Sequence, residues 1–178
     1  MTIEKKTELI ISLIEELITQ DPGFFLVDVK LKPGNSIQVL LDADQGVSLN
    51  KCVAYHRALF AKIEEASFFE PGDFLLEVSS PGLDEPLKMS RQYVKNIGRL
   101  VEVVLKDGRK ISGKLLTAEP QIVIEETIAR LSSKERNKDG GQGKGKKQPD
   151  QLNRSNGETV QHTFLLDQIK TTKIQIVF

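Results

Sequence analysis

Apolar residues recur at two different spacings along the first half of the chain. In residues 3–19 they return every three or four positions, which is typical of an amphipathic helix, and residues 49–66 repeat this pattern. Between these segments, residues 24–42 alternate apolar and polar positions around a turn at 33–36, which predicts a hairpin with one buried face. A short apolar run at 74–78 follows. The order helix, strand, strand, helix, strand predicts an α/β layer with helices covering one sheet face.

The second half of the chain carries the pattern of short strands. Strands are predicted at residues 100–106, 110–118, 121–127, 163–166 and 173–178, with a polar connection at 167–172 and one or two helical turns at 90–97, for which Ser90 is the expected cap. Asp107-Gly108 is a strong hairpin signal, and Gly113 is a plausible bend in a long strand. Five short strands predict a small closed barrel of the SH3-like or Sm-like kind, so the fold class of the whole chain is α+β.

Residues 130–157 interrupt the predicted barrel. This segment is rich in Gly, Gln, Asn and Lys and has almost no apolar residues. A segment of this composition cannot bury enough surface to order itself. We therefore predict a disordered insertion between the third and fourth strands of the barrel.

Charge divides the chain where the apolar pattern changes. Residues 1–87, the N-terminal half, hold seven Lys and Arg against fifteen Asp and Glu, a net charge of −8. Residues 88–178, the C-terminal half, hold eighteen against ten, a net charge of +8. We predict two domains, 1–88 and 89–178, of which the acidic one can face basic proteins and the basic one can face RNA. Two solvated faces that offset each other for solubility would explain the same charges.

The residues that could support catalysis are few. Cys52 is the only cysteine, which excludes an internal disulfide and a Cys-only metal site. Cys52 and His56 stand four apart on the second helix and could form a dyad. Free Cys is usually buried, and both residues lie on the apolar stripe of the helix, which favours packing. This predicted stripe consists of Leu49, Cys52, Val53, His56, Leu59, Phe60 and Ile63.

Ser80 stands on a turn but lacks the Gly-x-Ser-x-Gly frame of a nucleophile. No phosphate-binding glycine motif occurs. We therefore predict no catalytic activity, no cofactor and no metal. A small enzyme that uses Cys52 or Ser80 is the competing interpretation. The sequence also lacks a signal pattern and an apolar run long enough to span a bilayer, which predicts a cytoplasmic protein without a membrane partner.

Basic residues gather around the start of the predicted barrel. Phosphate contacts require a positive field of this kind, although an ordinary charged strand surface would look similar. The chain has no Trp, and Tyr93 is the only Tyr in its second half, so no platform for base stacking is suggested. The basic cluster consists of Arg91, Lys95, Arg99, Lys106, Arg109, Lys110 and Lys114.

The segment from Ser80 to Pro86 is a rigid exit from the last strand of the first half, because two prolines restrict its backbone. It is either an elbow between the domains or a direct contact with a partner. The stretch Leu76–Asp84, LEVSSPGLD, resembles the most recognisable stretch of the RimP family. The likeness covers nearly the whole chain, including Ile97-Gly98-Arg99-Leu100-Val101 and Asp167-Gln168-Ile169-Lys170.

The resemblance implies an α/β N-terminal domain followed by an SH3-like barrel. It also implies a role without catalysis in maturation of the 30S ribosomal subunit. The implied partners are the immature subunit, its twelfth ribosomal protein and 16S rRNA, and the protein is expected to be a monomer. An Sm-like RNA-binding regulator that acts off the ribosome is the alternative. The candidate partner-binding residues are Ser79, Ser80, Pro81, Gly82, Leu83, Asp84, Arg91, Arg99, Lys106, Arg109, Lys110 and Lys114.

A basic barrel and a basic ribosomal protein would repel each other at long range. We therefore hypothesise that different residues of the barrel meet the two partners. Glu102, with Glu125 or Glu126, would contact the protein. Arg99, Arg109 and Lys110 would face rRNA.

Overall fold

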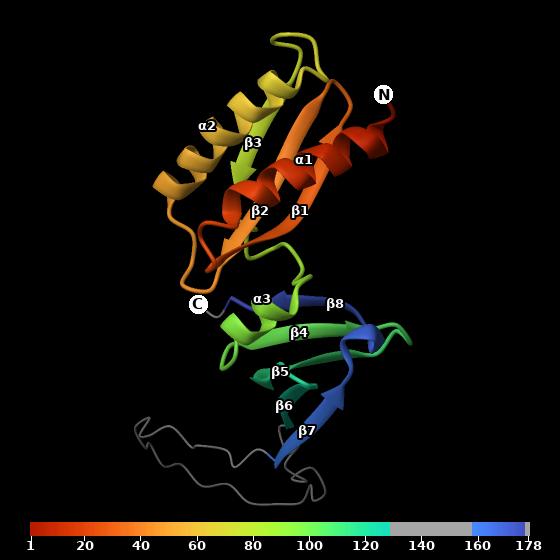
Figure 1. Cartoon of the computed structure of the whole chain (residues 1–178). Coiled ribbons are helices and arrows are strands. Elements are labelled where there is room, and N and C mark those ends of the chain that lie inside the picture. Colours follow the sequence, from red (N-terminus) through yellow and green to blue (C-terminus); the bar gives the residue numbers. More distant parts are fainter. Residues whose placement is uncertain (129–157, 177–178) are drawn as a thin grey trace, which may run out of the picture.

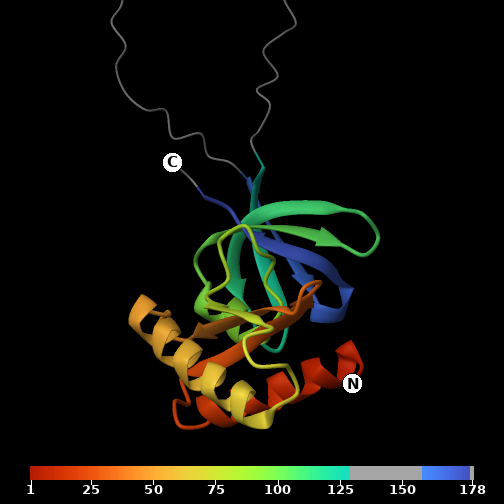
Figure 2. The same cartoon turned by 90° about the horizontal axis from the view of Figure 1, so that it is seen from above.

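A computed structural model describes residues 1–128 and 158–176 of the chain (Figure 1). Its N-terminal half follows the predicted order, with elements α1 (Ile3–Ile18), β1 (Phe24–Lys32), β2 (Ser36–Ala43), α2 (Leu49–Ala66) and β3 (Leu75–Ser79). Strand β2 lies in the centre of the sheet, antiparallel to β1 and parallel to β3. Both helices lie on the same face of this sheet, as Figure 2 shows. The predicted α/β layer is therefore confirmed.

The core of the N-terminal half lies between the two helices and β2. Buried side chains come from all three elements, among them Ile14, Val39 and Leu59. On α2, the buried residues are Cys52, Tyr55, Leu59 and Ile63.

The predicted stripe of α2 was wrong at its start. Leu49 is 79% exposed and Val53 is 41% exposed. The helical period instead turns Tyr55 inward, where its hydroxyl donates to Asp21 at 2.6 Å. Ser48 caps the helix as predicted, since its hydroxyl accepts from the Lys51 backbone N–H at 3.4 Å.

The C-terminal half contains a short helix and one five-stranded sheet. Its elements are α3 (Ser90–Lys95), β4 (Leu100–Leu105), β5 (Lys110–Thr117), β6 (Ile122–Ile128), β7 (Glu158–Phe164), the 3₁₀ helix η1 (Leu166–Gln168) and β8 (Ile169–Ile174). The strand order is β7-β6-β5-β4-β8, and every pair is antiparallel. The chain therefore returns at its end to lie beside β4.

Two predicted elements of this half need correction. Strand β7 begins at Glu158 rather than at residue 163, and β8 covers most of the stretch 167–172 that was expected to be a connection. The polar character of β8 was misleading, because Thr172 is fully buried beside Tyr93. The predicted insertion at 130–157 and the last two residues of the chain lie outside the described residues.

The expected cap of α3 was also wrong. Ser90 is the first residue of the helix, and Met89 occupies the cap position. The side-chain oxygen of Gln92 accepts from the backbone N–H groups of Lys88 and Met89 at 2.7 and 3.0 Å. This contact takes the place of a serine cap at the helix start.

The two halves have separate hydrophobic cores. The core of the N-terminal half includes residues from Ile10 to Val78, and that of the C-terminal half includes residues from Tyr93 to Ile169. No residue belongs to both clusters. Among the described helices, none is both long and apolar enough to cross a membrane.

Candidate functional site

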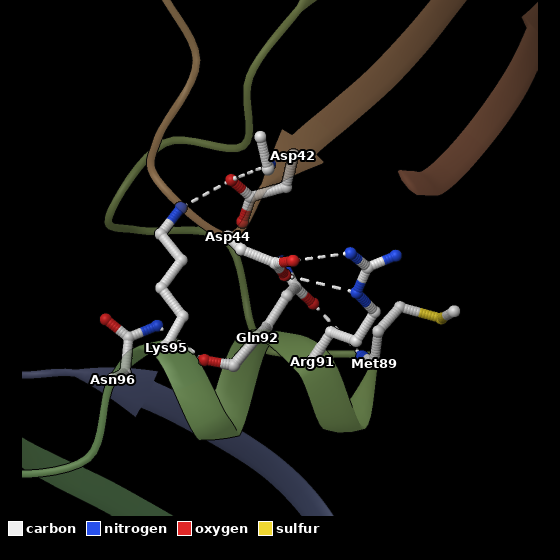
Figure 3. A network of polar contacts seen from close by, with 8 residues as sticks. Asp42, Asp44, Met89, Arg91, Gln92, Lys95 and Asn96 are labelled. Carbon is white, nitrogen blue, oxygen red and sulfur yellow. Dashed lines mark hydrogen bonds and ion pairs between the residues drawn. The ribbon is translucent and has the colours of Figure 1, made fainter. Parts of the chain in front are cut away.

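The two halves meet where the end of β2 faces α3, and opposite charges line the contact. Figure 3 shows Arg91 reaching from α3 toward Asp44, just beyond the end of β2. The Nε and Nη2 groups of Arg91 donate to the two carboxylate oxygens of Asp44 at 3.1 and 2.6 Å. Nη2 also donates to the Pro22 carbonyl at 3.0 Å, and the guanidinium lies over the Phe25 ring at 4.6 Å. Hydrogen bonding from Arg91 holds the pKa of Asp44 below its ordinary value of 3.8.

Two further ion pairs flank Arg91. The Lys95 ammonium lies 2.5 Å from Oδ1 of Asp42, a carboxylate that is largely buried. The Lys88 ammonium lies 2.5 Å from Asp28 on β1. Arg91 and Lys95 are four residues apart on α3, so the helix places them toward one side, and Lys88 lies just before the cap residue Met89. We call these three pairs the junction clasp: its basic side is Lys88, Arg91 and Lys95, and its acidic side is Asp28, Asp44 and Asp42.

A pocket of about 130 Å³ lies beside the clasp. The segment between β3 and α3 forms one wall of the pocket through Ser80, Pro81, Gly82 and Leu83. Gln92, Asn96 and Arg99 line it from the other half. The structure therefore brings four of the six candidate loop residues together with Arg99. Ser79 and Asp84 do not line this pocket.

The basic cluster predicted from the sequence is divided in space. Arg91 and Arg99 lie near the start of β4, whereas Lys106 and Arg109 lie in the turn after it. At about 3.3 Å per residue, the six residues of β4 separate these groups by roughly 15–20 Å. The side chains of Arg99, Lys106 and Lys114 form no ion pair with any other described residue. They are thus available to an external anion.

Several residues of the hypothesis that acidic and basic residues of the sheet face different partners are paired within the chain. Lys110 and Glu102 lie on adjacent strands, and their charged groups are 2.8 Å apart. Glu126 pairs with His162 at 2.9 Å instead. Arg109 is also paired, with Asp107 of its own turn, at 2.8 Å.

Comparison with known proteins indicates the family of the chain. A family model described as the RimP N-terminal domain matches residues 13–84. The chain is 36% identical over 114 residues to the ribosome maturation factor RimP of Cytophaga hutchinsonii, which covers 62% of this chain and 68% of that protein. It is 37% identical over 107 residues to the RimP of Christiangramia forsetii, with 60% and 67% covered. For the RimP of Flavobacterium psychrophilum the identity is 35% over 122 residues, with 68% and 76% covered.

The chain belongs to the RimP family. The resemblance inferred from the stretch LEVSSPGLD is therefore confirmed, and the family model ends at Asp84, the last residue of that stretch. The matched region also contains the acidic side of the junction clasp, Asp28, Asp42 and Asp44. The basic side lies beyond the matched region.

Sequence reasoning missed several residues of this RimP junction. Lys88 and Gln92 were not recognised, because neither belongs to a motif. Asn96 was missed as well; it is buried, and its Oδ1 accepts no hydrogen bond from any described residue. The opposite net charges of the two halves were the available signal, since they favour ion pairs at the point of contact.

The Cys52–His56 pair does not form a catalytic dyad. Burial raises the pKa of the Cys52 thiol, which disfavours a thiolate. The His56 Nε2 atom lies 3.0 Å from the Leu76 carbonyl, so its partner is β3 rather than Cys52. The half-buried His56 and the buried Cys52 thus take the packing role that the sequence favoured. In residues 1–128 and 158–176, no three His, Cys, Asp or Glu side chains are grouped so that they could hold a metal ion.

Proposed function

We propose that this RimP-family protein assists maturation of the 30S small ribosomal subunit in the cytoplasm by binding the immature subunit, with a small-subunit ribosomal protein and 16S rRNA as its contacts. The observation that carries the proposal is the likeness to ribosome maturation factors, of which this chain covers two thirds or more. These relatives are named for ribosome maturation rather than for a reaction, and the protein acts without catalysis.

The surface around the pocket supports this role. Ser80–Leu83 and Arg99 come from different halves yet line one pocket. Arg99 forms no ion pair within the described part of the chain, and it can therefore meet a phosphate or a carboxylate of the subunit. Lys106 and Arg109 are exposed in the turn after β4, where they supply a second positively charged region for contact with the subunit. Two separated contacts would favour an extended partner over a small ligand.

The finer architecture is part of the same proposal. Two cores without a common residue favour domains at 1–88 and 89–178. The five-stranded sheet has a buried inner face, with Val101, Leu115 and Ile124 at its centre. Irregular register between Leu115 and Thr117, and again between Val104 and Leu105, bends the strands. These features favour an SH3-like barrel, which short strands form by curling around one core.

The test is sedimentation of a cell lysate through a sucrose gradient, with detection of the protein in each fraction at low and moderate salt. We expect comigration with 30S particles and absence from 70S ribosomes. Arg99→Glu should reduce the bound fraction and lower the salt slope by roughly one, because one phosphate contact is lost. Lys5→Glu on α1 is the matched control, since it reverses an exposed charge far from the pocket.

Confinement to the top of the gradient at both salt concentrations would contradict the proposal. The Sm-like regulator would then be preferred, and it predicts tight binding to free RNA together with a ring oligomer. An Arg99→Glu protein that binds particles as well as the Lys5→Glu control would remove Arg99 from the contact while leaving the proposed function in place.

A further inference from the structure

The basic side of the junction clasp has the geometry of an anion-binding surface. Arg91 presents two N–H groups to the two oxygens of one carboxylate. A phosphate offers the same pair of acceptor oxygens, so the guanidinium can bind either group in the same bidentate way. Lys88 and Lys95 place an ammonium group on either side, each against a carboxylate. Three cations thus already hold three anions, all of which come from the other half of the chain.

The contact between the halves depends on these polar groups. The two hydrophobic cores share no residue, and a pocket of about 130 Å³ opens beside the clasp. The Arg91 and Asp44 side chains are 40% and 48% exposed. Ion pairs exposed to this extent contribute little net free energy and are screened by salt. An external polyanion can therefore compete most readily with Asp44 for Arg91. The carboxylates that hold Lys88 and Lys95 are less exposed, at 25% for Asp28 and 10% for Asp42.

The long-range charge indicates which polyanion fits. The described part of the C-terminal half, residues 88–128 and 158–176, holds ten Lys and Arg against seven Asp and Glu, a net charge of +3. Separation of the halves would remove the three carboxylates of the clasp from this positive surface. RNA carries phosphates in a regular series on one backbone, so a single strand can replace three carboxylates at once. Release of the counterions bound to RNA makes a favourable contribution to the free energy of binding, which a single carboxylate does not provide.

We infer that Lys88, Arg91 and Lys95 form an RNA phosphate-binding surface that the chain's own Asp28, Asp44 and Asp42 cover when the halves are closed. RNA binding and closure of the junction then compete for the same cations. This inference rests on the rRNA contact of the proposed function and adds where that contact lies and what masks it. It also accounts for Arg91, a candidate partner-binding residue in the sequence that is paired within the chain in this structure.

The test measures the affinity of the purified full chain for a fluorescently labelled single-stranded oligouridylate by fluorescence anisotropy at low salt. Asp44→Asn keeps the shape of the side chain but releases Arg91, and we expect it to tighten RNA binding by roughly three- to tenfold. Glu16→Gln is the matched control. It removes one negative charge from the same half and breaks the 3.0 Å pair of Glu16 with Lys62, which lies between α1 and α2. This control should change the affinity less than twofold.

A second variant distinguishes two explanations for a gain in affinity: release of the Arg91 cation, and a general loss of negative charge. Asp44→Asn combined with Arg91→Gln should lose the gain in affinity, because the released guanidinium is gone. In the unmodified protein, the NMR signal of the Arg91 Nε–H group should shift when RNA is added, as its bond to Asp44 is replaced. A backbone spectrum of each variant verifies that it is folded.

Four results would overturn the inference. Equal gains for Asp44→Asn and Glu16→Gln would indicate net charge alone. A gain that persists without Arg91, or RNA binding that leaves the Arg91 Nε–H signal unchanged, would place the RNA elsewhere. Polyglutamate added to the unmodified protein could shift the Arg91 Nε–H signal as readily as RNA does. That result would identify an acidic protein, rather than RNA, as the partner of this surface. None of these results depends on sedimentation with ribosomal particles, so failure of the inference and failure of the proposed function are distinguishable.

Discussion

Gly113 stands on β5 at a point where the backbone of the neighbouring strand β6 leaves no room for a side chain. A Cβ atom at this position would lie 2.3 Å from the Glu125 carbonyl oxygen and 2.8 Å from a side-chain carbon of Ile124. The obstructing oxygen belongs to the backbone of a paired strand, so it cannot move without disturbing the sheet. Gly113, which the sequence suggested as a bend, is therefore a site of close approach, and only glycine fits there without a shift.

Gly113→Ala should lower the free energy of unfolding by about 1–3 kcal/mol, because the added methyl group must displace the β6 backbone. Urea denaturation followed by circular dichroism measures the change. Gly23→Ala is the control, since nothing lies within 4 Å of a Cβ at Gly23. The control should stay within about 0.5 kcal/mol of the unmodified protein. A Gly113→Ala protein as stable as the control would contradict the close approach.

At the scale of elements, α3 connects the two halves although it has only six residues. A helix of this length is not stable alone, because its nucleation cost exceeds what so few bonds return. Tertiary contacts hold it in place. Tyr93 is buried in the core of the C-terminal half and donates to the Thr172 hydroxyl on β8 at 2.8 Å. With that side anchored, the opposite side presents Arg91 and Lys95 to the carboxylates of the N-terminal half.

A double-mutant cycle tests this anchor. Tyr93→Phe and Thr172→Val should each lower the free energy of unfolding by about 1–2 kcal/mol, because each leaves a buried hydroxyl without its partner. The double variant should lose less than the sum, since it removes both polar groups together. Urea denaturation of the four proteins gives the coupling energy. Strict additivity would show that the two hydroxyls do not interact.

At the scale of the whole molecule, two halves of opposite net charge, each with its own core, are joined by ion pairs and a short loop. Contacts of this kind allow relative motion of the parts unless a large apolar interface prevents it. Leu59 is fully buried in the core of the N-terminal half, and Leu115 is fully buried in the other. Each core should therefore unfold largely by itself, and loss of packing in one should leave the other intact.

Leu59→Ala should destabilise the N-terminal half by about 2–5 kcal/mol, the usual cost of a cavity at a buried leucine. Methyl NMR signals from the two cores, followed during urea denaturation, report each half separately. We expect the signals of Ile10 and Ile14 to disappear at lower urea, while those of Val103 and Ile124 keep their midpoint. Leu115→Ala should give the converse result. A common shift of all four signals in both variants would show that the molecule unfolds as one unit.

Local patterns in the sequence were sufficient for much of the fold. The helical spacing of apolar residues in 3–19 predicted α1, and the alternation of apolar and polar residues in 24–42 predicted the β1–β2 hairpin. Both patterns show which face of an element is exposed to solvent. The Asp107-Gly108 turn was also recognisable, because glycine readily adopts the positive φ, here 92° at Gly108, that a tight hairpin turn requires. The stretch LEVSSPGLD was sufficient to indicate the family.

Only the tertiary structure decided how these segments meet. Strand β8 was misplaced because the burial of Thr172 depends on Tyr93, which is 79 residues away in the chain. Arg91 was recognised as a cation, but its partner Asp44 lies 47 residues before it. A local pattern records exposure and turns, whereas the choice of a distant partner depends on packing and charge across the whole molecule. The loop Ser80–Leu83 was therefore visible in the sequence, while the pocket that it shares with Arg99 was not.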